Sequence, residues 1–170
     1  MKISDEQRQE LSDIYNHFFH EERIQKMKEV PMHRGSNTFL HSFRVAKVAI
    51  KRSLRHKKVN LKAVLIASIL HDYYLYDWRR DRSKKKRHGK DHPYIAVNNA
   101  KAHFNITDEV QEIIKAHMWP INFREFPKTR EARIVNLADD HIALKEFLTS
   151  KKHKQKRMEK YYQEIVTLFD

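Results

Sequence analysis

Residues that interrupt regular structure are scarce in this chain. Its 170 residues include only 2 glycines and 4 prolines. A β-sandwich or barrel needs a turn about every 8 to 12 residues, and glycine and proline mark many of those turns. A glycine-rich phosphate-binding loop is excluded for the same reason. We therefore predict an all-α protein, a compact single-domain bundle of about six to seven helices.

Apolar residues that recur at intervals of three and four indicate where the helices lie. We expect helices at about 5–28, 37–58, 60–74, 93–104, 107–118, 129–148 and 151–169. The centre of the third, AVLIASIL, is apolar on all sides and predicts a buried central helix. The segment 76–91 has almost no apolar residue and a dense basic run, so it predicts a solvated loop or a mobile lid. Pro93 suits the first turn of the helix that follows.

Positive charge predominates, with 35 Lys and Arg against 22 Asp and Glu, a formal net charge of +13. Such a charge attracts phosphates, nucleotides, nucleic acid or an anionic membrane surface, and it does not choose among them. The longest uncharged apolar run, 63–70, is far shorter than the ~20 residues of a membrane span. The first residues carry no apolar signal region, so we expect a cytoplasmic protein with no membrane partner.

The absence of cysteine excludes disulfides, thiolate zinc sites and thiol catalysis, and leaves His, Asp and Glu as metal ligands. Burying such a group without a partner costs about 1–3 kcal/mol or more, and a divalent cation would remove that cost. Imidazole and carboxylate together suit Mn, Fe or Zn and, less well, Mg. The candidate ligands at the borders of apolar segments are His41, His71, Asp72, His92, His117 and Asp139.

Two of these positions have a neighbouring competitor. Asp140 competes with Asp139, but Asp139 follows the apolar run 134–137 directly, and Asp140 would point about 100° away on a helix. His88 lies four residues before His92 and is an alternative ligand, although we expect it to be a loop histidine.

The order and surroundings of these residues resemble the HD-domain superfamily of metal-dependent phosphohydrolases. The similar stretches are TFLHSFRVA around His41, LIASILHD ending at Asp72, HPYIAVNNA from His92, IIKAHMWP around His117 and IVNLADD with Asp139. The chain resembles small bacterial HD proteins that carry HDYYLYDW and HMWP. We expect one HD domain over 1–170, with its core at about 37–147, an N-terminal helix at 5–28 and a basic C-terminal helix at 151–169.

The resemblance implies roles for these residues. His41, His71, Asp72 and Asp139 would hold one divalent metal ion. His92 and His117 are similar to the extra histidines of the binuclear branch, in which the HD aspartate, here Asp72, bridges both ions. A water between two metals would attack a phosphorus whose oxygens the metals polarise, so no protein nucleophile is required.

Other positions depart from the family pattern or suggest substrate contacts. Many relatives have Ala-Asp-Lys where this chain has Ala-Asp-Asp at 138–140, so a cation is missing there. Asp77 is the first acid after the HD pair and could act as general acid, with a structural salt bridge to Arg79 or Arg80 as the favoured alternative. Arg34 and Arg79 are candidates for gripping phosphate.

The other candidate contacts are an aromatic ring and a basic segment. Trp119 could stack on a base or plug the edge of the core. The basic segment 79–90 follows the HD pair, where the phosphates of a substrate would need charge neutralisation, so it could grip them as a lid or be only a solvated surface.

Two functions from different classes follow. The first is a phosphohydrolase that cleaves a phosphoester or phosphoanhydride of a nucleotide or a similar small substrate with one or two divalent ions. The second is a nucleic-acid or anionic-partner binding protein, in which the +13 charge acts and the metal site is vestigial or structural. The complete ligand set and the lack of a recognised nucleic-acid motif favour the first. The oligomeric state is left open.

Overall fold

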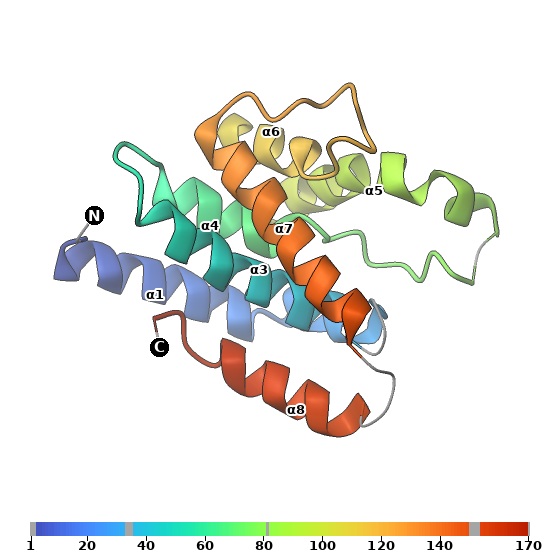
Figure 1. Cartoon of the computed structure of the whole chain (residues 1–170), viewed down its shortest axis with the longest axis horizontal. Coiled ribbons are helices and arrows are strands. Elements are labelled where there is room, and N and C mark those ends of the chain that lie inside the picture. Colours follow the sequence, from blue (N-terminus) through green and yellow to red (C-terminus); the bar gives the residue numbers. More distant parts are fainter. Residues whose placement is uncertain (1–2, 33–35, 81, 150–153, 170) are drawn as a thin grey trace.

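The protein is all-α, as the scarcity of glycine and proline predicts (Figure 1). The computed structural model describes residues 3–32, 36–80, 82–149 and 154–169, and for 82–85 it describes the backbone alone. Within these residues, the elements are α1 (Asp5–His20), α2 (Glu22–Gln25), the 3-10 helix η1 (Lys26–Glu29), α3 (Thr38–Ser53), α4 (Leu61–Leu70), α5 (Arg82–His103), α6 (Asp108–Ala116), α7 (Arg130–Leu148) and α8 (Lys154–Ile165). The described part contains no strand, and each of its helices is too short or too polar to cross a lipid bilayer.

Side-chain caps determine where several of these helices begin. The side chain of Asn37 accepts a hydrogen bond from the backbone N–H of Leu40 at the start of α3, and Asn60 caps α4 in the same way. Thr107 and Thr129 cap α6 and α7. Each cap satisfies a backbone N–H that has no partner within the helix. Four of the helices around the candidate ligands, α3, α4, α6 and α7, therefore start at fixed residues.

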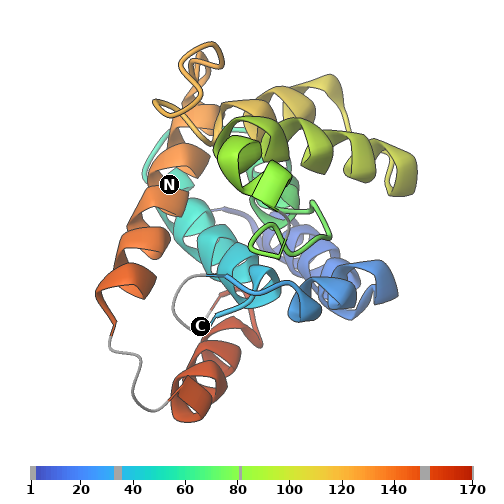
Figure 2. The ribbon, with the colours of Figure 1, turned by 90° about the vertical axis from the view of Figure 1, so that its right-hand side faces the viewer.

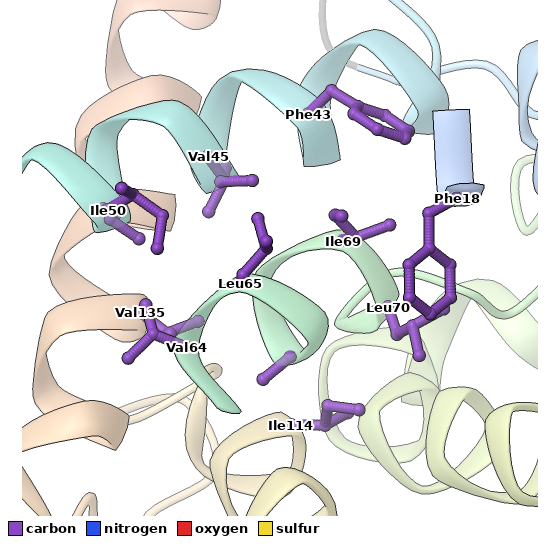
Figure 3. Close-up of a cluster of buried hydrophobic side chains, with 14 of the residues drawn as sticks. Phe18, Phe43, Val45, Ile50, Val64, Leu65, Ile69, Leu70, Ile114 and Val135 are labelled. Atoms are coloured by element: carbon purple, nitrogen blue, oxygen red, sulfur yellow. The ribbon is translucent and has the colours of Figure 1, made fainter. Parts of the chain in front are cut away.

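Helix α4 is the central helix, as its apolar sequence predicts. It contacts α1, α3, α5, α6 and α7. Leu65 and Ile69 on α4 lie close to Val45 and Phe43 of α3 in the core (Figure 3). Because α4 is buried on nearly all sides, the residues directly after its last turn emerge in the middle of the molecule.

Helix α3 is surrounded on its other sides by α7 and α8. It contacts both of them, and α8 lies across α3 from the α5–α6 pair (Figures 1 and 2). Phe39 and Phe43 of α3 pack with Phe19 of α1 at ring-centroid distances of 5.4 and 5.3 Å. Helix α3 therefore packs between the N-terminal helix α1 and the C-terminal helices α7 and α8.

Several predicted boundaries are wrong. Helix α4 ends at Leu70 instead of about residue 74, and α8 ends at Ile165 instead of residue 169. The largest error is at α5. Helix α5 begins at Arg82, so the predicted loop at 76–91 is helical from residue 82 onward, and Pro93 lies inside the helix instead of in its first turn. Lysine and arginine are good helix formers, and an ion pair of 3.1 Å between Arg87 and Asp91, one turn apart, stabilises this polar extension.

The predicted first helix is divided into three elements. Extended backbone at Glu21 (ψ 124°) ends α1, and α2 and η1 follow. The short α2 brings the number of α-helices in the described residues to eight, one more than the upper end of the predicted range.

Candidate metal centre

Six buried polar side chains meet in the interior, although five separate segments supply them. His41 lies within α3, and the pair His71-Asp72 directly follows α4. His92 lies in α5, and His117 is the C-terminal cap of α6. Asp139 comes from the middle of α7, and even this most exposed of the six has only 8% of its surface accessible.

Asp72 lies between two pairs of histidines and presents a different oxygen to each pair. Its Oδ2 lies 3.5 Å from Nε2 of His71 and 3.9 Å from Nε2 of His41. Its Oδ1 lies 3.2 Å from Nε2 of His92 and 3.8 Å from Nε2 of His117. One carboxylate therefore faces two sets of nitrogen donors.

Asp139 completes the first of these two sets. Its Oδ1 lies 2.8 Å from Nε2 of His41 and 3.6 Å from Nε2 of His71. On the other side of Asp72, the Nε2 atoms of His92 and His117 are 2.9 Å apart. The structure thus brings together all six predicted residues in two adjoining groups.

All four histidines are oriented by an acceptor at their other ring nitrogen. Nδ1 of His71 lies 2.8 Å from the backbone carbonyl oxygen of Ser68. Nδ1 of His92 lies 2.7 Å from the carbonyl oxygen of His88, and Nδ1 of His117 lies 2.7 Å from that of Ile114. Nδ1 of His41 lies 3.2 Å from a carboxylate oxygen of Glu146. A carbonyl or carboxylate can only accept, so Nδ1 donates and Nε2 faces the centre, the arrangement common among metal-binding histidines.

The donor set fits divalent metal ions. Nε2 of His71 is buried and has no hydrogen-bond partner, which is costly for a polar atom unless another ligand satisfies it. Ligand atoms within 4.8 Å of one another form three overlapping groups, which are His41, His71 and Asp72; His71, His117 and Asp139; and Asp72, His92 and His117. Imidazole nitrogens with carboxylate oxygens suit Mn, Fe or Zn.

The electrostatics reflect this concentration of donors. Burial lowers the pKa of His41, but Glu146 and Asp139 outweigh it and hold that pKa well above the usual 6.5. The pKa of His71 is also raised, because Asp72 and Asp139 outweigh burial. Burial raises the pKa of Asp139, yet the hydrogen bond from His41 and the nearby imidazole of His71 bring it well below 3.8. Positive charge is therefore favoured between these carboxylates.

In the second group, the pKa of His117 is lowered instead of raised. Burial, followed by the nearby His71 and His92, lowers the pKa of His117 to about 3. The pKa of Asp72 lies far below 3.8, because His71 and His92 more than offset the effect of its burial. His117 is thus a neutral imidazole near pH 7, the form that binds a metal.

A comparison with protein families identifies the family to which this chain belongs. The family model of the HD domain matches residues 38–144, more than half of the chain. The chain belongs to the HD domain family. HD domains are usually metal-dependent hydrolases, and the buried His and Asp groups of this chain could hold a metal. Comparisons with curated proteins and with solved structures found no match.

A cavity of about 250 Å³ opens onto the metal-ligand candidates of this HD domain. Four of the six candidates, Asp72, His92, His117 and Asp139, line it. The remaining lining residues are mostly apolar or aromatic: Met32, Trp78, His88, Met118, Trp119, Pro120, Ile121, Asp140 and Ala143. This wall contains no lysine or arginine among the described side chains, despite the net charge of +13.

Trp119 is held at the edge of this cavity. The side chain of Asn136 on α7 donates hydrogen bonds to the backbone carbonyls of His117 and Trp119, at 2.7 and 2.8 Å. The indole contacts Phe126 edge-on, and 36% of the residue is exposed. Trp119 therefore lines the cavity with a partly accessible ring and does not plug the core.

Asp77 and Arg79 form a salt bridge, the alternative that the sequence favoured. Arg79 Nε and Arg80 Nε each lie 3.3 Å from a carboxylate oxygen of Asp77. Within the described side chains, neither Asp77 nor Arg79 lines the cavity. Arg34, the other predicted phosphate contact, lies outside the described residues.

The two competing residues also have definite places. His88 stacks on His92 at 4.5 Å and on Trp78 at 4.9 Å, and its carbonyl orients His92. It is absent from the groups of converging ligand atoms in the described residues and lies in α5, not in a loop. Asp140 lines the cavity beside Asp139, and burial together with Asp139 raises the pKa of its carboxyl group.

Glu146, which contacts His41, was not predicted from the sequence. A signal for it does exist, because Glu146 follows Asp139 by seven residues, close to two helical turns, and must share its face of α7. An acid on the face of a helix that already carries a metal ligand is a candidate partner for a ligating histidine.

Proposed function

We propose that this HD-domain protein is a metal-dependent phosphohydrolase that uses two divalent ions. The observation that carries the proposal is the position of Asp72, whose Oδ2 faces His41 and His71 and whose Oδ1 faces His92 and His117. A carboxylate with one oxygen toward each donor group is suited to bridging two ions. Mn, Fe, Zn or Mg would be the bound metal.

In this proposal the two ions have Asp72 as a common ligand. The first ion would be held by His41, His71, Asp139 and Asp72. The second ion would be held by His92, His117 and Asp72. Divalent ions bound there would polarise phosphoryl oxygens and make water a nucleophile at neutral pH. The chain contributes neutral imidazoles held by their Nδ1 acceptors, and buried carboxylates that balance the charge of the metals.

The substrate would be a small phosphoester or phosphoanhydride, such as a nucleotide. The cavity volume of about 250 Å³ supports a small molecule. Its phosphate would lie beside Asp72 and Asp139, and its organic group would contact the apolar wall. Trp119 could stack on a flat ring there. Since the described wall carries no Lys or Arg, the metal ions would provide most of the neutralisation of the phosphate.

The net charge of +13 favours a second candidate function, binding of nucleic acid or another anionic partner. The two functions make different predictions for one experiment. Purified protein that has not met a chelator is analysed for metal and screened with nucleotides and other phosphoesters in the presence of Mn, Fe, Mg and Co. We expect bound metal and turnover of at least one phosphoester.

A matched pair of variants sharpens this screen. Asp72→Asn should abolish turnover, whereas Glu131→Gln should retain it. Glu131 is also buried, but it lies at the N-terminal end of α7, away from the candidate ligands. There its Oε1 accepts a hydrogen bond of 3.0 Å from the backbone N–H of Asn60. Tight binding of nucleic acid with no turnover under any metal would support the second function and refute the first.

A further inference from the structure

Glu146 links a candidate metal ligand to a buried arginine. Only 2% of its surface is exposed, and its two carboxylate oxygens have different partners. Oε2 lies 3.2 Å from Nδ1 of His41, and Oε1 accepts a hydrogen bond of 2.7 Å from Nη1 of Arg44. Glu146 lies beyond the last residue that the HD family model matches, residue 144.

Arg44 extends these contacts to the C-terminal helix. Its Nε donates a hydrogen bond of 3.0 Å to Oε2 of Glu164, and its guanidinium lies 3.6 Å from the ring centroid of Tyr161. Glu164 and Tyr161 are both on α8, which lies outside the family match. A continuous set of contacts therefore runs from α8 through Arg44 and Glu146 to His41.

We propose that Glu146 is a positioning residue for His41, and that Arg44 and α8 hold Glu146 in place. Helix α8 then helps to orient a metal ligand through Arg44 and Glu146, although the family model does not include it. This inference rests on the proposed function, because it assigns Glu146 a purpose only if His41 binds a metal.

The physical reason lies in the two nitrogens of the imidazole. If Nδ1 donates to Glu146, the lone pair of Nε2 is available to a metal beside Asp139 and Asp72. A carboxylate also makes the ring a stronger ligand than a neutral carbonyl does. His71, His92 and His117 use backbone carbonyls for this purpose, so His41 differs from them in depending on a side chain that can be replaced.

Arg44 is required because a buried carboxylate needs a compensating charge. Its planar guanidinium meets two carboxylates with two different nitrogens and rests on an aromatic ring. This is the fixed, multi-donor geometry for which arginine is suited and lysine is not. The position of Glu146 is thus determined by contacts from α3, α7 and α8 together.

The alternative is that Glu146 and Arg44 form a salt bridge that only stabilises the packing of three helices. Metal affinity distinguishes the two roles, since a packing defect lowers stability without specifically weakening a metal site. The test compares Mn²⁺ binding to the full-length wild-type protein, Glu146→Gln and the control Glu131→Gln. Affinity is measured by competition with a chelator of known affinity, and unfolding by urea is followed in parallel.

We expect Glu146→Gln to weaken Mn²⁺ binding about 10- to 100-fold, the usual effect of losing a residue that orients a metal ligand. Glu131→Gln should bind Mn²⁺ as the wild type does, even where it lowers stability. Glu164→Gln should weaken binding less than Glu146→Gln, because Arg44 still contacts Glu146. Equal Mn²⁺ affinity in wild type and Glu146→Gln would overturn the inference, and unchanged affinity in Glu164→Gln would remove α8 from it.

A second measurement does not depend on the folding of any variant. In Zn²⁺-loaded wild-type protein with ¹⁵N-labelled histidine rings, we expect the His41 signal to show a proton on Nδ1 and none on Nε2. A ring protonated at Nε2 would refute the role of Glu146. Wild-type protein that takes up neither metal would refute the proposed function and this inference together, whereas metal uptake with unaltered Glu146→Gln affinity would refute the inference alone.

Discussion

Metal binding to this centre should release protons. Nε2 of His41 lies 2.8 Å from Asp139 Oδ1, and the pKa values of His41 and His71 are both raised above 6.5. Both rings therefore favour the protonated form at slightly acidic pH. A metal ion that takes their Nε2 lone pairs must displace those protons, so affinity should fall as the pH is lowered.

The size of the effect follows from the number of protons. Each proton released changes the apparent affinity tenfold per pH unit, which corresponds to about 1.4 kcal/mol. Release of about two protons from His41 and His71 would weaken binding of the first ion roughly 100-fold between about pH 6.5 and 5.5. His117, whose pKa is lowered to about 3, is already neutral in this range and contributes no proton.

Isothermal titration calorimetry measures this release directly. Mn²⁺ is added to metal-free protein at about pH 6 in two buffers that differ in their enthalpy of ionisation, and the difference in heat gives the number of protons. His117→Gln is the matched control, since it removes a ligand of the second ion that carries no proton and should leave the number of protons released with the first ion unchanged. Binding of Mn²⁺ at this pH without proton release would refute the assignment of His41 and His71 as protonated ligands.

Four further outcomes can be checked. Asp72→Ala should abolish metal retention and hydrolysis, and full metal content by elemental analysis would contradict the bridging role. His92→Ala should be milder and remove mainly the second ion, which the same analysis would detect. Leu65→Ala in the core should lower the free energy of unfolding by about 2–5 kcal/mol in urea titrations, and a loss below about 1 kcal/mol would contradict its tight packing. Trp119→Ala should raise KM for a nucleotide more than for a small aliphatic phosphoester, and equal KM changes would argue against stacking.

Much of the fold was accessible from local sequence signals. The cap residues Asn37 and Thr107 mark the starts of α3 and α6, and the run 63–70 identifies the buried α4. The start of α5 was predicted wrongly for a physical reason. The first turns of this helix are polar and have no apolar periodicity, so the sequence pattern does not reveal them. Pro93 also normally marks a helix start, whereas here the helix continues through it.

The candidate site could be predicted only in part, for a different reason. His41, His71, Asp72, His92, His117 and Asp139 follow from motif order and from the cost of burying polar groups at the borders of apolar helices. Which oxygen of Asp72 faces which histidine depends on how α3, α4, α5 and α6 are rotated against one another. No local pattern encodes that rotation, so the assignment of each Asp72 oxygen to its pair of histidines required the structure.

The rotation of α7 connects the parts of the site that sequence did and did not reveal. Asp139 and Glu146 are seven residues apart, close to two turns, so one orientation of α7 directs both carboxylates toward His41 on α3. The same orientation turns Asp140 about 100° away, and Asp140 lines the substrate cavity instead. A shift of α7 by one residue would remove a metal ligand and the partner that orients His41 together. The metal centre therefore depends on the packing of α7 against α3, and Arg44, which contacts Glu164 of α8, is hydrogen-bonded to Glu146 near the C-terminal end of α7.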